Sequence, residues 1–378
     1  MTEKWYICAA KCHILAMRTL NRYASDEEGV LATFSFLRFP LIVMVVICHA
    51  YIYKLPASGS VEGFAALSFV LSKIVARIAV PNFLFISGYL LFRGVENPSL
   101  RLYCEKLKRR LRTLVIPYIF WNLAIILLYF MGQILVPDLF SGGNARVCDY
   151  TPLEWLQAFW RVDGTDSPIN PPLWYMRNLM VLVVLSPVVY LLLKNRVVGA
   201  LFLATMLGLW LGVPKCGEVV WLQPKVVFFF SLGAWFSIHR VAFPKFRLSA
   251  TAVLLSLYIA AIVGTLSTVG EWQRFVYEVA ILLGMPLSLY VAHYLVVERG
   301  WQVPSLLGSS YFFIYLYHYI PQALVQRVML RVLSPATNGG YLVIYIFSVV
   351  VTLFAGVLLF HLMKRFLPKT TAFILGNR

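Results

Sequence analysis

Long apolar runs separated by short polar stretches dominate the chain. An apolar window of about 20 residues is long enough to cross a membrane as a helix, because the hydrocarbon layer is ~30 Å thick. Such windows predict ten membrane-spanning helices and hence an all-α fold, a polytopic membrane helix bundle. The expected spans are residues 34–53, 65–92, 113–135, 172–193, 197–213, 219–238, 249–268, 275–297, 309–330 and 341–363.

Lysine and arginine outside these spans are unevenly distributed. When the spans are assigned alternate sides, most of the basic residues fall on the side that holds both termini. The positive-inside rule then predicts that both termini are cytosolic. The expected organisation is a cytosolic N-terminal segment at 1–33, a membrane domain at 34–365 and a cytosolic tail at 366–378. No cleavable leader is recognised in the mixed polar N-terminal segment.

Composition supports this assignment. Of 378 residues, 60% are hydrophobic and 13% are charged, and the mean hydropathy is +0.77, which excludes an ordinary soluble domain. The net charge of +17 could indicate nucleic acid, but the basic residues lie in short segments between apolar runs, so we interpret them as topology signals. Cys148 and Cys216 fall in two outer loops and could pair there. The run from Cys8 to His13 lacks a second ligand pair, so no metal site is predicted.

Two ionisable residues interrupt the first apolar run, FLRFPLIVMVVICHA. Arg38 and His49 are eleven positions apart, which is close to three full helical turns, so they share one face about 16 Å apart along the axis. Buried ionisable groups in a membrane are costly, and both should face the bundle interior. Arg38 lies near the cytosolic end and could instead extend its side chain to the surface. His49 is either a hydrogen-bonded interhelical residue or a general base.

Two other spans carry polar positions. The second contains Lys73, Arg77, Pro81 and Asn82, which predict a broken helix lining a polar cavity. In the ninth, polar side chains follow one helical stripe that must face protein or water. The stripe either packs between helices or brings a second histidine, His318, into the cavity that His49 faces. Its members are Tyr311, Tyr315, His318, Tyr319, Gln322 and Gln326.

Five segments in order resemble motifs of the acyltransferase type 3 family, integral membrane enzymes that transfer acyl groups from acyl-coenzyme A to cell-surface carbohydrates. They are LRFPLIVMVVICHA, RIAVPNFLFISGYLL, RRLRTLVIPYIFW, PLWYMRNLMVLVVLSP and SSYFFIYLYHY. The resemblance covers about residues 34–365. One departure is Asn178, where related sequences favour an acidic residue, so a partner for Arg177 is expected elsewhere, with Glu278 as the candidate.

The resemblance implies a donor site on the cytosolic side. Acetyl-coenzyme A would be the acyl donor, a substrate and not a bound cofactor. Arg109 and Arg112, three apart on one helical face, would bind its phosphates, although the same residues could act only as topology determinants. Arg38 and Arg77 would orient the thioester or stabilise the developing oxyanion. His49 would be the general base or would carry the acyl group transiently.

The resemblance also implies an acceptor site. Trp174 and Tyr175 could stack on a sugar, although aromatic residues are common at membrane interfaces for other reasons. Ser87 is expected to aid helix packing and donate a hydrogen bond, and not to act as a nucleophile. Tyr315, His318 and Glu278 complete the expected cavity.

The function that follows is a multi-pass O-acetyltransferase of the cytoplasmic (inner) membrane. It would acetylate a hydroxyl of a cell-surface polysaccharide or of its lipid-linked precursor, with the bilayer, acetyl-coenzyme A and a carbohydrate as partners and no nucleic acid. Two alternatives stay open. One is a transporter or flippase of a polar lipid-linked sugar. The other is transfer of another acyl group, such as succinyl.

Overall fold

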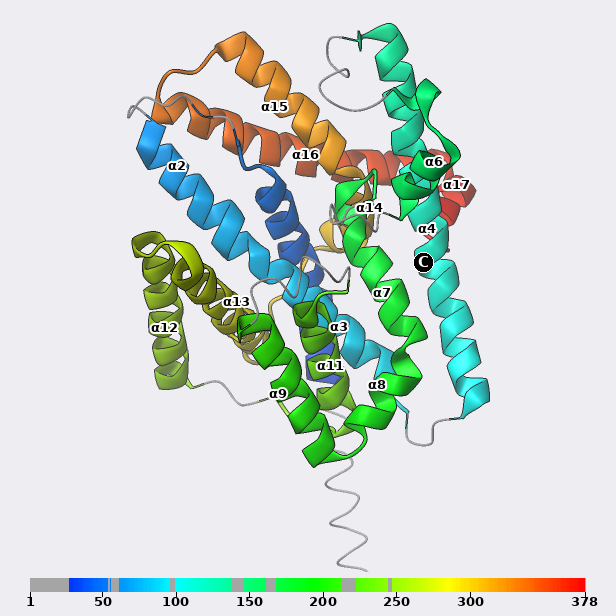
Figure 1. Cartoon of the computed structure of the whole chain (residues 1–378), viewed down its shortest axis with the longest axis vertical. Helices are drawn as coiled ribbons and strands as arrows, with labels where there is room; N and C mark the ends of the chain where they lie inside the picture. The colour runs from blue at the N-terminus through cyan, green and yellow to red at the C-terminus, as the bar shows by residue number, and fades with distance from the viewer. Residues whose placement is uncertain are drawn as a thin grey trace, which may run out of the picture.

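The computed structural model describes residues 27–53, 55, 61–95, 99–137, 146–160, 168–212, 222–243 and 247–377. Every regular element among these residues is a helix (Figure 1). The first helix is Glu27–His49. The others are α2 Glu62–Phe69, α3 Ala79–Phe92, α4 Leu100–Leu135, α6 Pro152–Phe159, α7 Trp174–Val184, α8 Ser186–Leu193, α9 Arg196–Gly212, α11 Pro224–Ile238, α12 Leu248–Ser267, α13 Gly270–His293, α14 Ser305–Tyr317, α15 Tyr319–Leu333, α16 Asn338–Phe366 and α17 Pro368–Ile374.

Six helices in the described ranges are long and apolar enough to cross a membrane, which makes the chain a multi-pass membrane protein. They are Glu27–His49, Glu62–Phe92, Arg101–Leu135, Leu248–Ser267, Gly270–Glu298 and Asn338–Phe366. The expected fourth span is a seventh candidate, but it bends by 64° between α7 and α8. Pro187 explains the bend, because it has no N–H for the carbonyl of Val183. The expected fifth and sixth spans are the shorter helices α9 and α11, so ten spans and cytosolic termini stay predictions.

The second span is one long rod with an irregular middle. A π-helical turn, Val70–Val75, and a 3₁₀ turn, Ala76–Ile78, join α2 to α3. They lie directly before Pro81, whose missing N–H would otherwise have bonded to the carbonyl of Arg77. The break predicted from the proline is therefore a local change of helical pitch within a continuous rod.

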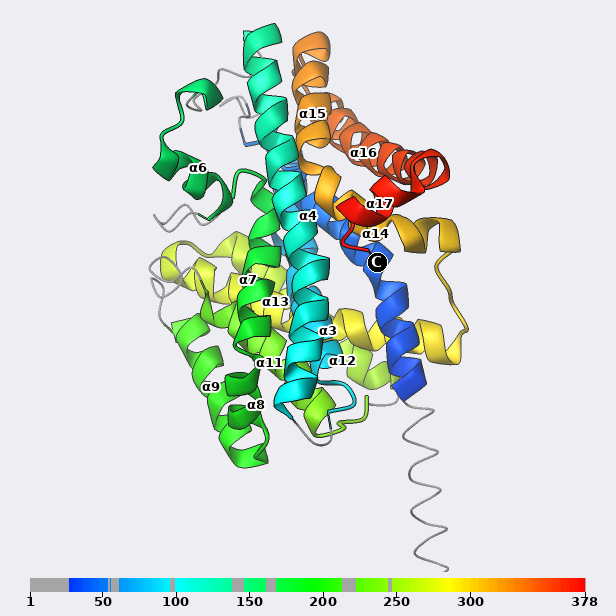
Figure 2. The same cartoon turned by 90° about the vertical axis from the view of Figure 1, so that its right-hand side faces the viewer.

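The ninth span departs from the prediction of one helix over 309–330. It is two helices, α14 and α15, separated by a turn at His318, and Figure 2 shows them running in different directions. Pro321 cannot donate to the carbonyl of Tyr317, and the carbonyl of Leu316 accepts a hydrogen bond from the Asn170 side chain. Proline and a side chain from another segment together end α14 at this point.

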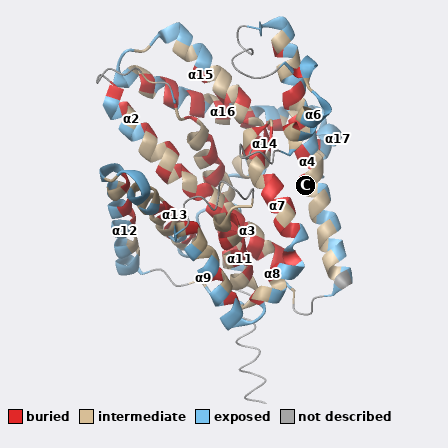
Figure 3. Cartoon of the chain, in the orientation of Figure 1, coloured by how far each residue is buried: buried red, intermediate tan, exposed pale blue. Residues whose placement is uncertain are grey.

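The centre of the molecule is built on a close contact between α3 and α11, where Figure 3 shows buried residues concentrated. A Cβ added at Gly88 would lie 1.9 Å from the carbonyl oxygen of Phe230, and one added at Gly233 would lie 1.9 Å from that of Phe85. Only glycine allows the two backbones to approach so closely. This contact fixes α3, and with it Ser87, next to α7.

The long helix α4 begins earlier than the expected third span. The basic stretch Arg101–Arg112, which lies before the expected span at 113–135, forms its first turns, with Ser99 capping the start by accepting the N–H of Leu102. The C-terminal helix α17 packs against α4, and Trp121 donates its indole N–H to the carbonyl of Ile374. The basic residues are thereby held on a rigid helix.

The outer loop expected at 136–171 contains one short helix, α6. Thr151 and Glu154 form a capping box at its start, and these hydrogen bonds hold the pKa of the Glu154 carboxyl below its ordinary value. The helix packs beside α4, where the hydroxyl of Tyr118 donates to the carbonyl of Phe159. Cys148 is exposed, and its candidate disulfide partner Cys216 lies outside the described residues, as do Cys8 and His13.

Candidate active site

A cavity of about 150 Å³, here called the central cavity, lies between the first helix, α3, α4, α7 and α14. Seven of the residues selected from the sequence line it, namely Arg38, His49, Ser87, Trp174, Tyr175, Tyr311 and Tyr315. Arg38, Val45 and His49 all line it from the first helix. The shared face predicted from the spacing of Arg38 and His49 is therefore confirmed.

Hydrogen bonds fix the shape of the wall formed by α3, α7 and α14. The Tyr175 hydroxyl is 3.0 Å from Ser87 Oγ and 3.3 Å from the carbonyl oxygen of Phe83. Tyr315 donates its hydroxyl to the carbonyl of Pro172 at 2.7 Å. The hydroxyls of Tyr175 and Tyr315 are thus already hydrogen-bonded to other segments. The rings of the two residues are therefore what they chiefly offer to the cavity. Ser87 makes the hydrogen bond expected of it, while the neighbouring Gly88 provides the close packing.

His49 is packed between two residues that flank the turn between α14 and α15. Its ring centroid is 5.3 Å from that of His318 and 5.2 Å from that of Tyr319. His318 is fully buried and is not among the residues that line the central cavity. The prediction that His318 lines the cavity is therefore wrong, and His318 instead contacts His49.

The orientation of His318 follows from its hydrogen bonds. Its Nδ1 lies 3.0 Å from the carbonyl oxygen of Ile314 and 2.9 Å from that of Tyr315, so Nδ1 must carry the hydrogen and Nε2 is an acceptor. Nε2 is buried and has no protein hydrogen-bond partner in the described part of the chain. The contact places an imidazole with a free acceptor nitrogen beside His49.

The rest of the polar stripe also faces the first helix. Gln322 donates to the carbonyl of Val46 at 2.9 Å, and Gln326 donates to that of Ala50 at 2.6 Å. Arg38 has its guanidinium 5.5 Å from the ring centroid of Tyr311. The stripe thus packs between helices, and its members Tyr311 and Tyr315 line the central cavity. The second histidine contacts His49 without lining that cavity.

A second and larger hollow, here called the basic vestibule, adjoins the central cavity. Its volume is about 1230 Å³, and Leu90 and Arg110 line both spaces. Its basic side chains come from the end of α3, the first turns of α4 and the ends of α8 and α11. They are Arg93, Lys106, Arg109, Arg110, Lys194, His239 and Arg240, with Glu27 as an acidic lining residue.

Local structure holds two of these cations in place. Arg93 pairs with Glu27, with Nε 2.6 Å from Oε1. Arg240 has a positive φ of 51°, a left-handed conformation that is costly for a residue with a Cβ. Such strain at a cavity wall is typical of a functional constraint. The vestibule thus gathers basic side chains from several helices around one hollow.

The two arginines expected to bind the donor separate in the structure. Arg109 lines the basic vestibule, whereas Arg112 is exposed and is not among its lining residues. Arg110, which the sequence analysis did not select, occupies the junction between vestibule and cavity. Its position on the inner side of α4 depends on where the helix starts, at Leu100, which lies well before the expected span at 113–135.

The remaining selected residues lie outside both spaces. Arg77 is half-buried beside His49, within electrostatic reach of Glu278. Glu278 pairs with Lys225, at 3.6 Å between Nζ and Oε1. Arg177 is fully buried, with Nε 3.4 Å from Asn178 Oδ1 and its guanidinium over the ring of Trp160. Arg177 and Glu278, considered as a pair from the sequence, thus contact different groups.

Comparisons with known proteins identify the family of the chain. A family model described as an acyltransferase domain matches residues 31–361. The succinoglycan biosynthesis protein ExoH of Rhizobium meliloti is 26% identical over 363 residues, which cover 93% of this chain and 94% of that protein. No solved structure gives a significant match. Among the described residues, no group of three or more His, Cys, Asp or Glu side chains is arranged to hold a metal ion.

Proposed function

Because the chain belongs to the acyltransferase-3 family and is an acyltransferase, we propose that it transfers an acetyl group from acetyl-coenzyme A to a hydroxyl of a cell-surface polysaccharide or of its lipid-linked precursor. The observation that carries the proposal is the junction at Arg110, which joins a large basic vestibule to a small cavity containing His49 and Arg38. The relative named for succinoglycan biosynthesis supports a polysaccharide acceptor.

The vestibule is the site for the charged end of the donor. Coenzyme A carries three phosphate groups, and arginine side chains bind phosphate strongly. Arg93, Arg109, Arg110 and Arg240 supply such groups around one hollow. The basic residues that line it all lie in segments that the sequence assigned to the cytosolic side, which supports a cytosolic donor. The thiol arm would pass Leu90 and Arg110 into the central cavity.

His49 acts on the acceptor in this proposal. It takes the proton of the acceptor hydroxyl as the oxygen attacks the thioester carbonyl carbon, and a new ester C–O bond forms. The C–S bond then breaks, and the proton held by His49 passes to the departing thiolate. Arg38 stabilises the negative charge that develops on the carbonyl oxygen. Trp174 and Tyr175 provide flat surfaces for a sugar ring at the same cavity.

The membrane setting suits the reaction. The donor is made in the cytosol, whereas surface glycans are assembled or exposed outside. A cavity between the two faces can receive the thioester from one side and the hydroxyl from the other. We place the protein in the cytoplasmic membrane on this reasoning.

A succinyl donor is the second candidate, and a specific observation favours it. Two guanidinium groups, those of Arg38 and Arg110, line the central cavity, where the free carboxylate of a succinyl group would find a cation. Arg38 has a different role for the acetyl donor and for the succinyl donor. For acetyl transfer it stabilises the transition state, whereas for succinyl transfer it also binds the ground state and should affect the donor KM.

The proposal is tested by mass spectrometry of surface polysaccharide from cells with and without this protein. We expect a mass difference of one acetyl group per modified sugar, and fragmentation locates it. A succinyl difference selects the second candidate. An unchanged polysaccharide, together with no thioester consumption by the purified protein when lipid-linked sugar is supplied, overturns both. Cells carrying the His49→Ala variant are the control for indirect effects of deletion.

A further inference from the structure

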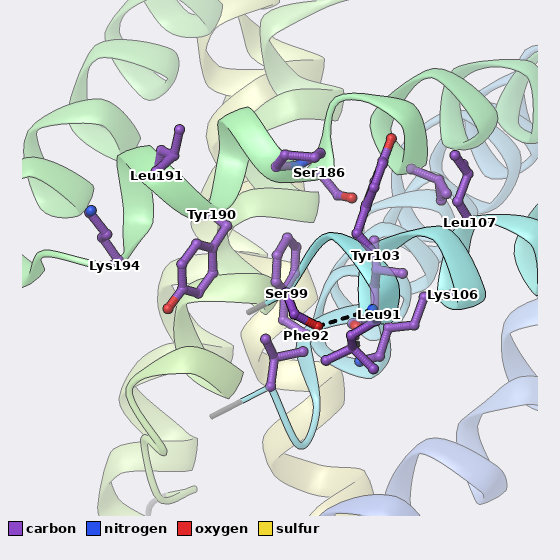
Figure 4. Close-up of a pocket in the computed structure, with 14 residues that line it drawn as sticks. Leu91, Phe92, Ser99, Tyr103, Lys106, Leu107, Ser186, Tyr190, Leu191 and Lys194 are labelled. Carbon is purple, nitrogen blue, oxygen red and sulfur yellow. Dashed lines mark hydrogen bonds between the residues drawn. The ribbon is translucent and has the colours of Figure 1, made fainter. Parts of the chain in front are cut away.

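A separate pocket of about 400 Å³, here called the apolar pocket, lies outside the central cavity. It is enclosed by the end of α3, the first turns of α4 and the bend between α7 and α8. Figure 4 shows Tyr190, Leu191 and Lys194 on α8 at one side and Tyr103, Lys106 and Leu107 on α4 at the other. None of the residues that line this pocket was selected from the sequence.

Several polar groups of the apolar pocket are already engaged within the protein. The Tyr103 hydroxyl donates to the carbonyl of Val184 at 3.0 Å. Lys106 Nζ donates to the carbonyls of Leu91 and Arg93 at 2.8 and 3.1 Å. Ser99 Oγ accepts the N–H of Leu102. A nucleotide base or a sugar would need polar partners, and these groups do not offer them, so the pocket favours a hydrocarbon chain.

The apolar pocket opens toward a surface suited to lipid. Val184, Val188 and Leu191 are all exposed large apolar side chains at the α7–α8 bend, and Leu191 also lines the pocket. In a multi-pass membrane protein such an exposed apolar face contacts the acyl chains of the bilayer. A chain from the bilayer can therefore enter without crossing water.

The opposite end of the apolar pocket is basic. Five of its lining residues, Phe92, Val95, Lys106, Tyr190 and Lys194, also line the basic vestibule. Lys194 is exposed at the end of α8, and Arg93 and Arg240 lie in the same vestibule. A ligand with its tail in the pocket would thus place its head group among cations, which is the charge pattern of an anionic amphiphile.

We propose that the apolar pocket binds an anionic membrane phospholipid, with one acyl chain between α4 and α8 and the phosphate at Lys194. Zwitterionic phospholipids have the same chains but no net charge, so the preference rests on the head group. The lipid site shares five lining residues with the basic vestibule, but the proposal does not rest on the identity of the acyl donor.

The test uses the purified full-length protein in non-ionic detergent. Binding of phosphatidylglycerol and of phosphatidylcholine with identical chains is measured by native mass spectrometry. We expect phosphatidylglycerol to bind about fivefold more tightly or better, since a basic side chain near an anionic lipid contributes ~1 kcal/mol. Lys194→Glu should remove this preference. The matched control, Arg196→Glu, changes a neighbouring exposed cation that does not line the pocket and should retain it.

A second pair of variants tests the tail. Leu191→Trp should fill the mouth of the apolar pocket and weaken binding of both lipids, whereas Leu201→Trp, at an exposed apolar position on α9, should not. Thermal unfolding in the same detergent checks that each variant is folded. If Lys194→Glu is unfolded, Lys194→Gln is used in its place. Equal affinity for the two lipids, or unchanged binding in both test variants, overturns the proposal. The proposal is also overturned if adenosine 3′,5′-bisphosphate displaces the bound lipid and Leu191→Trp weakens binding of this nucleotide. That result would assign the pocket to the acyl donor.

Discussion

The imidazole of His318 packs against that of His49, with ring centroids 5.3 Å apart, and of the two it is His49 that lines the central cavity. The Nδ1 of His318 is tied to two carbonyl oxygens at the end of α14. This leaves Nε2 as an acceptor beside the proposed base. His318 is therefore a candidate positioning residue, which can hold the ring of His49 in one orientation.

The first prediction concerns this contact. His318→Phe keeps a ring of similar size but removes the acceptor nitrogen beside the proposed base, and we expect kcat to fall several-fold because packing alone then orients the His49 ring. The donor KM should change little, because His318 touches neither the cavity nor the basic vestibule. His318→Gln restores an acceptor and should recover part of kcat. A purely structural role would instead lower the amount of folded protein and leave kcat per folded molecule unchanged.

The second prediction concerns His49 itself. His49→Ala removes the proposed base, and kcat should fall by a factor of about 10² to 10⁴, with the protein still extracted in normal amounts. The readout is acyl transfer by membranes or purified protein with acetyl-coenzyme A. Tyr319→Phe, which keeps the ring that contacts His49, is the matched control and should stay active. Near-normal transfer in His49→Ala would exclude the mechanism.

The spacing of residues predicted what depends on one helix alone. Arg38 and His49 share a face because eleven residues complete almost three turns, and the structure places both on one cavity wall. The polar stripe likewise faces protein, with Gln322 and Gln326 bonded to the first helix and Tyr315 bonded to Pro172. These relationships need no knowledge of neighbouring segments, so periodicity was sufficient to find them.

The features that the sequence did not predict depend on partners distant along the chain. The break at His318 combines Pro321 with a hydrogen bond from Asn170, far away in sequence, to the carbonyl of Leu316. Arg110 was overlooked because the six basic residues of Arg101–Arg112 give no signal of which side faces inward until the helix start is known. Glu278 was assigned to the cavity, but it contacts Lys225, because burial alone does not say which neighbouring space a side chain faces.

The third prediction separates donor binding from topology. Arg110→Gln should raise the donor KM roughly tenfold, since a hydrogen bond to a charged group contributes about 1.5–3 kcal/mol, with a smaller effect on the acceptor KM. Arg112→Gln, on the same helix but exposed and outside both spaces, is the matched control. If the two variants have the same donor KM, the basic stretch acts only in topology.

The fourth prediction uses the strained backbone of Arg240. A left-handed residue with a Cβ costs roughly 1–2 kcal/mol, so Arg240→Gly should relieve strain while removing a vestibule cation. We expect a higher donor KM together with a thermal unfolding midpoint above that of Arg240→Ala, which keeps the strain and loses the same charge. Thermal unfolding in detergent and steady-state kinetics on one preparation check both. An unchanged donor KM in both variants would remove Arg240 from the donor site.

The fifth prediction concerns the contact that holds Ser87 beside Tyr175. Gly88→Ala would place a Cβ 1.9 Å from the Phe230 carbonyl oxygen, so α3 and α11 must separate. We expect a lower unfolding midpoint and reduced transfer, because the Ser87 hydroxyl would also shift from Tyr175. Gly208→Ala is the matched control, since a Cβ there meets nothing within 4 Å. In a helix this change should stabilise by about 1 kcal/mol. If both alanine variants raise the midpoint, the backbones of α3 and α11 are not in the contact described.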